Sequence, residues 1–546
     1  MKKKMKINVS RKTIFVVLVA IVLVSFSFKS KFFEVAKQIE IYNTLFKELN
    51  MYYVDEINPA DLTDKVIKNT LKDLDPYTNF YNEQDVEDVR IRREGEYGGI
   101  GVSVNYDKRG IEIREVYKGF SADKAGLKAG DVITVIDNQS IENMNRDQLF
   151  SFLKGTPNST FSVKIDRQGS LITKEITRDK VIINPVPFSE MIDEETGYIV
   201  LTRFNEKAST EVKKAFKALK EKGMQKLILD LRSNPGGSLL ESINICNFFL
   251  PKGKTIVTTK AKIKKWSNTY RTTNKPLDLE IPIVVLVNGR SASASEIVSG
   301  SLQDYDRAVI MGQRSFGKGL VQRYRKLTYG TQLKVTISKY YTPSGRCIQE
   351  LDYTNRKKDG TVPKFSDLGI NEFKTQNGRI VFDGGGILPD VITKESTKTK
   401  ATEVLVNSSA IFNFATDYYY KNPDLAVGDS YDFKDEDFVK FTNFLKTDTS
   451  FVTQQEKLFK EAYEITSSKK ITKEYAKIKS ILFDAKIAEI SKNDDILKKV
   501  IREEILHRYV YEEGVYRYNL KKDQTITEAV ALLQNQHEYK KLLSAK

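Results

Sequence analysis

The sequence predicts a multidomain protein with an α/β core, a small α+β domain inserted before it, and helical regions at both ends of the chain. Three observations support this fold class. The chain has 546 residues, of which 40% are hydrophobic, enough for several domains with real cores. Short apolar runs alternate with helical stretches in its middle, after a Gly-rich segment of short strands. The final part combines many charged residues with apolar residues at helical spacing, a pattern typical of solvated helices.

Composition excludes several classes of function. The net charge is +16, from 88 basic and 72 acidic residues, but the lysines are spread along the chain without an aromatic-interleaved basic motif. Nucleic acid is therefore not an expected partner. Cys246 and Cys347 are too few for a disulfide framework or a Cys-rich zinc site, and we expect both to be free. We expect no metal, nucleotide or other cofactor.

Residues 1–30 have the charged and apolar parts of an export signal or a membrane anchor. The apolar run 14–28 follows a set of basic residues: Lys2, Lys3, Lys4, Lys6, Arg11 and Lys12. The run is shorter than the ~20 residues that span a bilayer comfortably, and the nearest cleavage site, at 25–27, is weak. Retention and removal are both open. In either case we expect the rest of the chain outside the cytoplasm, because the basic residues stay inside.

Residues 31–95 are predicted to form an N-terminal helical region, since apolar residues such as Leu45, Leu49, Val66 and Leu71 recur at helical spacings there. In residues 96–180 the pattern changes to short strands and Gly turns. Strands are expected at 98–104, 111–116 and 130–136.

This strand order, with Ala-Gly-Leu-x-x-Gly-Asp-x-Ile at 125–133, resembles a PDZ domain. The resemblance implies a Gly-rich turn that presents backbone N–H groups to the terminal carboxylate of a peptide, which pairs with the strand edge. That turn would comprise Gly99, Ile100, Gly101 and Val102. A Gly-rich hairpin without a ligand is the structural alternative.

Residues 181–395 are predicted to form the α/β core. Largely apolar runs at 226–232, 283–287 and 307–312 have the character of buried strands. Catalytic groups are expected in the loops at the ends of such strands. Residues 396–546 are predicted to form a charged, mainly helical C-terminal region, where solvated helix faces and partner contact are both open.

Ser293 stands among alternating serines that lead from the run 283–287 into a helix. At a helix N-terminus, unsatisfied N–H groups and the helix dipole favour developing negative charge. Spacing does not choose among Ser291, Ser293 and Ser295. Ser293 with Glu296 also fits an S-x-x-E capping box, so a purely structural role is an alternative.

A serine nucleophile needs a group that takes its proton. The chain has only two histidines, His507 and His537, both in the charged C-terminal stretch, so a Ser-His-acid triad is not expected. Lys318, between two glycines, is the candidate base, provided that burial leaves its amine neutral. An exposed loop lysine is the alternative. The segment is not a phosphate loop, because Gly319 stands where Ser or Thr is required.

A third element, Asp-Leu-Arg-Ser-Asn-Pro-Gly-Gly at 230–237, follows a predicted buried strand. Its Pro-Gly-Gly turn could aim backbone N–H groups at a tetrahedral oxyanion, with the Ala294 N–H as a second donor. The alternative is a tight turn that leads into the helix from Ser238.

These three elements, in this order and after a PDZ-like domain, resemble the C-terminal processing peptidases, or tail-specific proteases, of the Ser-Lys type. The resemblance runs from about residue 52 to residue 390 and includes the motifs at 74–78, 230–237, 291–296, 315–322, 342–346 and 385–390. It implies a ClpP/crotonase-like core. One departure is Lys154-Gly155, where many relatives carry Arg-Gly, which leaves an arginine-based coupling between PDZ domain and protease in doubt.

The resemblance also implies roles for single residues. Ser293 would be the nucleophile, Lys318 the general base, and Gln322 the residue that holds the lysine amine. The oxyanion hole would be formed by Gly236 or Gly237 together with Ala294. Asp304 would support the site from the same helix as Ser293.

The function implied is that of an exported serine endopeptidase, which recognises the free C-termini of exposed or unfolded polypeptides and cleaves them through an acyl-enzyme. We expect it in the cell envelope, on the periplasmic side of the inner membrane. The C-terminal region would provide a surface that binds an adaptor protein or forms a homodimer. A catalytically silent PDZ-containing envelope scaffold is the second hypothesis, and it predicts a disrupted Ser, Lys or Gln position, whereas all three are intact. An amidase or lipid esterase would need a deep small-molecule pocket.

Overall fold

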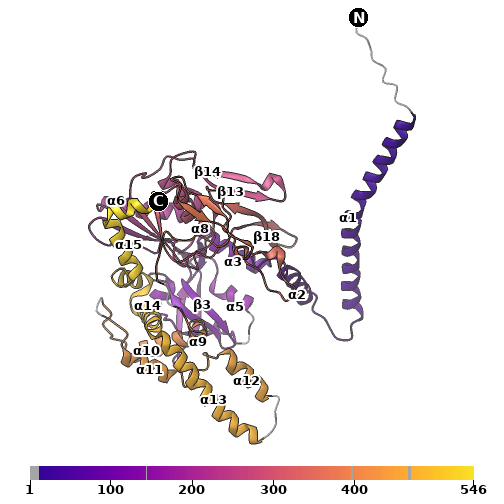
Figure 1. The fold of residues 1–546 in the computed structure, drawn as a ribbon. Helices are drawn as coiled ribbons and strands as arrows, with labels where there is room; N and C mark the ends of the chain where they lie inside the picture. Colours follow the sequence, from indigo (N-terminus) through magenta and orange to yellow (C-terminus); the bar gives the residue numbers. More distant parts are fainter. Residues whose placement is uncertain are drawn as a thin grey trace. The chain divides into compact units, whose positions relative to one another are not determined.

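In a computed structural model, the protein is described over residues 11–545, apart from residues 143, 145, 395–396, 429–430 and 465–468. The chain divides into two compact units, one up to Phe80 and one from Tyr81 onward (Figure 1). The first unit contains α1 (Arg11–Tyr52) and α2 (Pro59–Lys72). Helix α2 begins where Asn58 caps the N–H groups of Ala60 and Asp61. Among the helices described, none has the length and apolarity needed to cross a membrane. The first ten residues of the expected export segment lie outside the described residues.

The second unit begins with the end of β1 (Asn79–Tyr81) and α3 (Glu83–Glu94), followed by a small strand-rich domain. Strand β2 (Glu96–Gly99), which precedes this domain, pairs antiparallel with β9 (Asp179–Ile182), which follows it. Between them lie β3 (Val102–Asp107), β4 (Gly110–Val116), α4 (Ser121–Lys124), β5 (Val132–Ile136), β6 (Gln139–Ser140), α5 (Arg146–Leu153), β7 (Thr160–Arg167) and β8 (Ser170–Thr177). The sheet order is β3-β4-β5-β7-β8. Isoleucines and valines that alternate along the strands, such as Ile111, Ile113 and Ile133, fill its core.

The core of the second unit is a six-stranded sheet of order β10-β11-β12-β15-β16-β21. Its strands are β10 (Phe188–Met191), β11 (Thr196–Val200), β12 (Lys226–Asp230), β15 (Ile283–Val287), β16 (Val309–Gly312) and β21 (Val391–Ile392). All neighbours pair in parallel except β10 with β11. All five residues of β15 are buried, which explains its unbroken apolar sequence.

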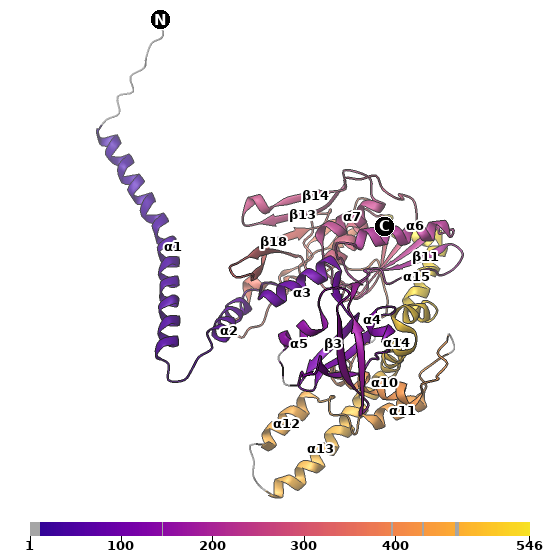
Figure 2. The same cartoon turned by 180° about the vertical axis from the view of Figure 1, so that it is seen from behind.

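Helices cover both faces of this sheet, because successive side chains of a strand point to opposite sides. Leu227, Leu229 and Val285 pack with α6 (Ala208–Glu221), α7 (Leu239–Phe249) and α8 (Ala294–Asp304). Ile228 and Val284 on the other face pack with α15 (Gln524–Gln534) and α16 (Gln536–Leu542). Helix α15 contacts strands β12, β15 and β16, and Figure 2 shows it beside this sheet. The last helices of the chain therefore complete the core.

Smaller sheets flank the core. Strands β13 (Thr255–Ala261), β14 (Asn268–Arg271), β17 (Leu320–Lys326) and β18 (Gln332–Tyr341) pair antiparallel, and β19 (Glu372–Lys374) pairs with β20 (Ile380–Phe382). Short 3₁₀ helices lie at Lys264–Trp266, Tyr353–Asn355, Phe365–Leu368 and Ser491–Asn493.

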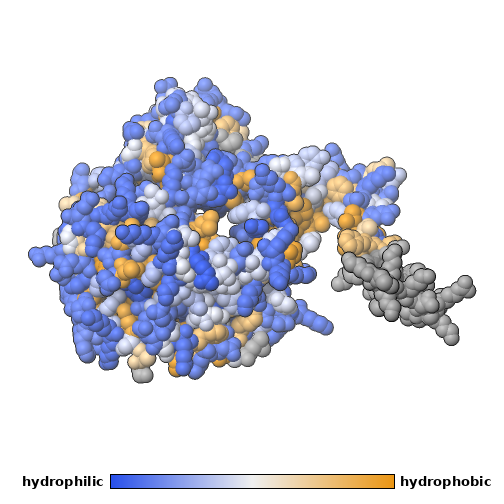
Figure 3. All heavy atoms as spheres, turned by 90° about the horizontal axis from the view of Figure 1, so that it is seen from above, coloured by the Kyte–Doolittle hydropathy of each residue, from blue (hydrophilic) through white to orange (hydrophobic). Residues whose placement is uncertain are grey.

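The remaining C-terminal helices have a core of their own. They are α9 (Lys400–Val406), α10 (Ala410–Lys421), α11 (Asp435–Phe444), α12 (Gln454–Glu464), α13 (Lys469–Ile490) and α14 (Asp494–Leu520). Edge-to-face contacts of Phe414 with Phe433 and Phe441 lie at its centre. The region expected as one unit, 396–546, thus divides its packing between this helical core and the sheet. Figure 3 shows one face of the protein, which is mainly hydrophilic with dispersed apolar residues.

Candidate active site

Ser293 lies at the turn between β15 and α8, where the sequence predicts it. Its φ of +57° lies in the left-handed region, which is strained for a residue with a side chain. Helix α8 begins at the next residue, so unsatisfied N–H groups lie beside the serine. We call residues 288–293 the serine turn.

The three serines of this segment have different environments. Ser291 and Ser295 are fully buried, and their hydroxyls donate to the carbonyls of Leu231 (2.8 Å) and Asn234 (2.9 Å). Ser293 is only half-buried. The geometry thus singles out Ser293 as the serine that a substrate can reach, a choice that spacing alone leaves open.

Glu296 forms hydrogen bonds both to the serine turn and to the segment that contains Lys318. Its carboxylate is completely buried and accepts four hydrogen bonds: from Ser293 N–H (2.7 Å), Lys318 N–H (3.0 Å), Gly317 N–H (2.7 Å) and the Ser315 hydroxyl (2.6 Å). Burial raises the pKa of Glu296, although the four donors oppose this. The sequence marks Glu296 only as a capping residue. Its bonds to a loop far along the chain carry no local signal.

Lys318 lies in the lysine loop, which we define as residues 313–319 between β16 and β17. Its side chain is half-buried. The flanking glycines permit close packing, since a Cβ on Gly317 would lie 2.7 Å from the Glu350 Cβ. Gln322 lies on β17, where its amide donates to the Thr336 hydroxyl (3.2 Å). That Gln322 holds the lysine amine stays a prediction.

The glycine turn, residues 233–237, lies directly against the serine turn. A Cβ on Gly236 would lie 2.9 Å from the Ala294 nitrogen and 2.6 Å from the Ala292 carbonyl oxygen. The Gly236 N–H itself donates to the Asn234 side chain (2.9 Å). Of the two glycines that the sequence leaves open, Gly237 is therefore the better candidate donor to an oxyanion, together with Ala294.

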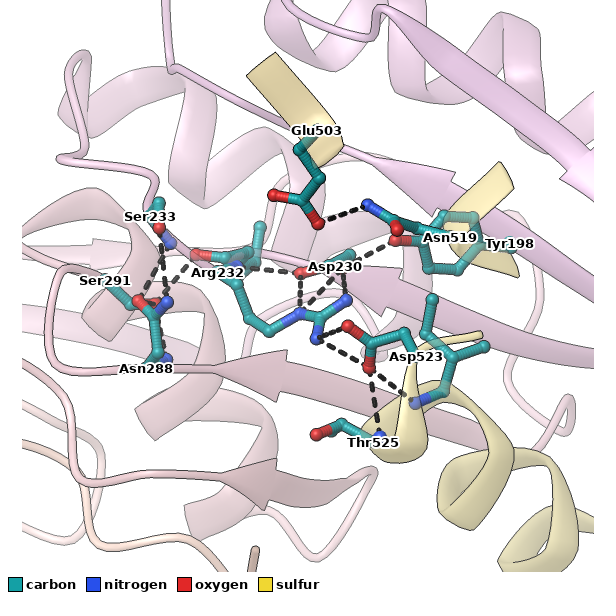
Figure 4. Close-up of polar contacts among 12 residues, drawn as sticks. Tyr198, Asp230, Arg232, Ser233, Asn288, Ser291, Glu503, Asn519, Asp523 and Thr525 are labelled. Carbon is teal, nitrogen blue, oxygen red and sulfur yellow. Dashed lines mark hydrogen bonds and ion pairs between the residues drawn. The ribbon is translucent and has the colours of Figure 1, made fainter. Parts of the chain in front are cut away.

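A buried ionic cluster precedes the glycine turn (Figure 4). Arg232 donates to both carboxylate oxygens of Asp230 and, on its other side, to both oxygens of Asp523 (3.1 Å each). Tyr198 also donates to Asp230 (2.6 Å). Asp523 precedes α15, so the C-terminal helices reach the strand end beside the candidate site. The sequence gives no sign of this contact.

Asp304 lies at the end of α8, the helix that begins after Ser293, and its support of the site stays a prediction. Its carboxylate pairs with the fully buried Arg346 (2.8 Å) and accepts the Ser344 N–H (2.9 Å). These two bonds hold the turn at 342–346.

The expected peptide-binding turn of the small domain has the conformation that its glycines permit. Gly101 has a φ of +78°, and a Cβ there would lie 2.4 Å from the Phe120 Cβ. The carbonyls of Ile100 and Gly101 accept N–H groups of Ala122 and Tyr117 within the domain. The N–H contacts of Gly99 to Val102 with a peptide stay a prediction.

Lys154, the residue after α5, forms an ion pair with Asp88 of α3 (3.0 Å), and its ammonium lies over the Tyr97 ring. Desolvation lowers the pKa of Lys154, although Asp88 opposes this. In this chain the residue thus joins the small domain to the helix before it.

Three family models match the chain. Peptidase family S41 matches residues 195–355, the PDZ domain matches residues 88–166, and "Probable PDZ-protease, C-terminal helical domain" matches residues 401–533. Together they cover the core, the small domain and the C-terminal helices.

Similar proteins are described as proteases of the same kind. The carboxy-terminal-processing protease of Bartonella bacilliformis is 34% identical over 326 residues, 58% of this chain and 74% of the relative. A probable CtpA-like serine protease of Staphylococcus aureus is 32% identical over 333 residues, 60% of this chain and 65% of the relative. Among solved structures, the photosystem II D1 C-terminal processing protease is 29% identical, with 56% of this chain and 83% of that chain covered and a TM-score of 0.35. The chain therefore belongs to peptidase family S41, among the carboxy-terminal-processing serine proteases that carry a PDZ domain.

Proposed function

We propose that the protein is an exported endopeptidase that binds the C-termini of polypeptides through its PDZ domain and cleaves them with Ser293 and Lys318. One observation carries this proposal. A single oxygen of Glu296 accepts the N–H groups of both Ser293 (2.7 Å) and Lys318 (3.0 Å), so the two nitrogens cannot lie farther apart than the sum of these distances. A lysine side chain is long enough to reach a serine hydroxyl from that position.

In this mechanism the neutral Lys318 amine takes the proton of the Ser293 hydroxyl as its oxygen attacks the scissile carbonyl carbon. The N–H groups of Gly237 and Ala294 stabilise the resulting oxyanion. The Lys318 ammonium then protonates the leaving amine as the C–N bond breaks, which leaves an ester on Ser293. Water hydrolyses this ester with Lys318 again as the base.

The remaining roles follow from the chain's other parts. Residues 1–30 would direct the chain to the cell envelope and hold it at the periplasmic side of the inner membrane, or be removed there. Gln322 would orient the lysine amine. The helical C-terminal region would offer a surface for an adaptor or for a second copy in a homodimer.

Lys318→Ala tests the mechanism. We expect cleavage of an unfolded reporter to be lost while the thermal unfolding midpoint stays unchanged, because the side-chain amine contributes the chemistry and the backbone N–H of residue 318 still donates to Glu296. Lys326→Ala, an exposed lysine on the adjacent strand, is the control and should cleave normally. Wild-type activity should also rise with pH as the amine becomes neutral. Full activity of Lys318→Ala would exclude Lys318 as the base.

The role of the PDZ domain is tested with two reporters that differ only at the last residue, a free carboxylate or an amide. We expect a higher KM for the amide, because backbone N–H groups at the Gly-rich turn recognise the charge. Equal kinetics for both reporters would argue against recognition of a C-terminus.

A further inference from the structure

The C-terminal helical region contacts the strand end beside the candidate site through Asp523. Asp523 lies between α14 and α15 and accepts both hydrogen bonds from one Arg232 nitrogen (3.1 Å each). The side chains are 9% and 22% exposed, so solvent screens this pair only weakly. Figure 4 shows the Arg232 guanidinium held between Asp230 and Asp523. Arg232 is thus fixed from the strand on one side and from the C-terminal helices on the other.

The backbone around Arg232 holds both turns of the candidate site. The Leu231 carbonyl accepts the Ser291 hydroxyl (2.8 Å), and the Ser233 N–H donates to the Asn288 side chain (2.9 Å). Ser233 also has a φ of +59°, a conformation that persists only where its surroundings hold it. A shift of Arg232 would therefore be transmitted to the serine turn and to the glycine turn.

The charges explain why a second carboxylate stabilises this arrangement. Desolvation alone would lower the pKa of Arg232, but attraction from Asp230 and Asp523 raises it well above its ordinary value. Burial alone would raise the pKa of Asp523, but the charges of Arg232 and Lys499 keep it below its ordinary value. Both groups are thus charged at neutral pH, and removal of one carboxylate leaves a buried guanidinium with half of its partners.

We propose that Asp523 is a positioning residue for catalysis: through Arg232 it holds the glycine turn in the geometry that stabilises the oxyanion. The C-terminal helical region is then part of the active-site scaffold and more than a surface for partners. This inference rests on the proposed Ser293-Lys318 function. Because oxyanion contacts form in the transition state, loss of Asp523 should lower kcat and leave KM unchanged.

Asp523→Asn separates this role from helix capping. Asp523 also caps α15 by accepting the N–H groups of Thr525 (3.0 Å) and Ile526 (3.2 Å), and asparagine caps a helix as well as aspartate does. In the full-length chain we expect kcat, normalised to titrated active sites, to fall about tenfold for a short peptide ester. The affinity for a peptidyl boronic acid, whose tetrahedral adduct imitates the oxyanion, should weaken by about the same factor.

Two further variants complete the experiment. Asp523→Glu keeps the carboxylate and should recover most of the loss, which a merely structural defect at this position would not predict. Asp435→Asn is the matched control: Asp435 is 90% exposed and pairs with Lys498 on α14, away from the core, so its removal should leave both readouts unchanged.

The outcomes distinguish the two proposals. If the wild type cleaves, Ser293→Ala does not, and Asp523→Asn matches the wild type in normalised kcat and boronate affinity, the inference about Asp523 is overturned while the proposed function stands. If Asp523→Asn loses kcat only in proportion to its fraction of titrated sites, the residue acts on folding alone and the inference fails too. If the wild type shows no cleavage that depends on Ser293, the proposed function itself fails.

Discussion

Ser293 adopts a backbone conformation that costs about 1–3 kcal/mol for a residue with a Cβ. Glu296, in the first turn of α8, helps to offset this cost, because its carboxylate accepts the Ser293 N–H at 2.7 Å. The same group holds the lysine loop by three further bonds. A residue that resembles a helix cap in the sequence therefore joins the serine turn, with the proposed nucleophile, to the lysine loop, with the proposed base.

Glu296→Gln should disrupt both segments. Glutamine offers one carbonyl oxygen and one NH₂ group, so some of the four donors that surround residue 296 lose their acceptor, at a cost of roughly 1–3 kcal/mol for each stranded group. We expect a lower free energy of unfolding in urea and a large loss of kcat. Glu456→Gln is the control, because Glu456 accepts the Thr453 N–H (2.8 Å) in the same capping position of a distant helix. It should lose stability without losing normalised kcat; an active Glu296→Gln would contradict the proposed role.

At the scale of elements, the glycine turn requires glycine for two reasons. One is its backbone conformation, and the other is that the backbone of the serine turn packs directly against it. Gly236 has a φ of +94°, and its missing side chain leaves room for the backbone of Ala292 and Ala294. Gly253, in the loop before β13, has a similar φ of +89° with no heavy atom within 4 Å of an added Cβ. The two positions therefore separate backbone strain from steric contact.

Gly236→Ala should abolish activity and lower the unfolding midpoint strongly, since the new methyl group would overlap backbone atoms that cannot yield. Gly253→Ala should lower the free energy of unfolding by about 1 kcal/mol, the strain of a left-handed backbone at alanine, and should keep full activity. Both are measured by thermal unfolding and by active-site titration. Equal effects of the two substitutions would show that contact at the glycine turn is unimportant.

The elements around the site could be predicted from the sequence because their signals are local. The apolar run 283–287 coincides with β15, and the periodic residues after Ser293 form α8. Contacts between distant segments have no such signal. The Asp523–Arg232 pair and the packing of α15 on the sheet join residues that no sequence pattern links. The bond from the Gly236 N–H to Asn234 depends on the exact geometry of one turn, which the sequence does not specify.

At the scale of the whole second unit, helix α14 links the PDZ domain to the core. Its Tyr511 donates to Asp123 of α4 (2.6 Å), and Asp523 follows shortly after its end. Arg114 of β4 lies over the Phe412 ring of α10 at 3.4 Å. Figures 1 and 2 both show α10 and α14 beside the small domain. The helical region therefore contacts both functional parts of the chain.

This interface should be sensitive to pH through Glu115. Burial, followed by the charges of Glu512 and Glu504, raises the pKa of Glu115 to about 7, with Arg203 opposing. A carboxyl whose pKa is raised on folding resists ionisation, so its effect on stability is absent below its unfolded pKa and grows unfavourable as pH rises to about 7. Glu115→Gln should raise the free energy of unfolding at pH 8 by up to about 3 kcal/mol and by much less at pH 5.

The nearby His507 titrates in the opposite sense, because burial lowers its pKa, but it is present in both proteins and cancels in the difference. The measurement is the unfolding midpoint of the wild type and of Glu115→Gln at both pH values. A difference that does not change with pH would mean that Glu115 is ionised freely in the folded protein.

The role of Ser293 as the nucleophile is the central prediction for this protein. The decisive measurement is mass spectrometry of an unfolded reporter with an apolar C-terminal tail after incubation with the wild-type chain and with Ser293→Ala. We predict internal cleavage fragments with the wild type and an intact reporter with the variant, at equal thermal stability of the two proteins. Fragments of the same masses from both proteins would contradict the account, and an intact reporter with both would support a peptide-binding scaffold instead.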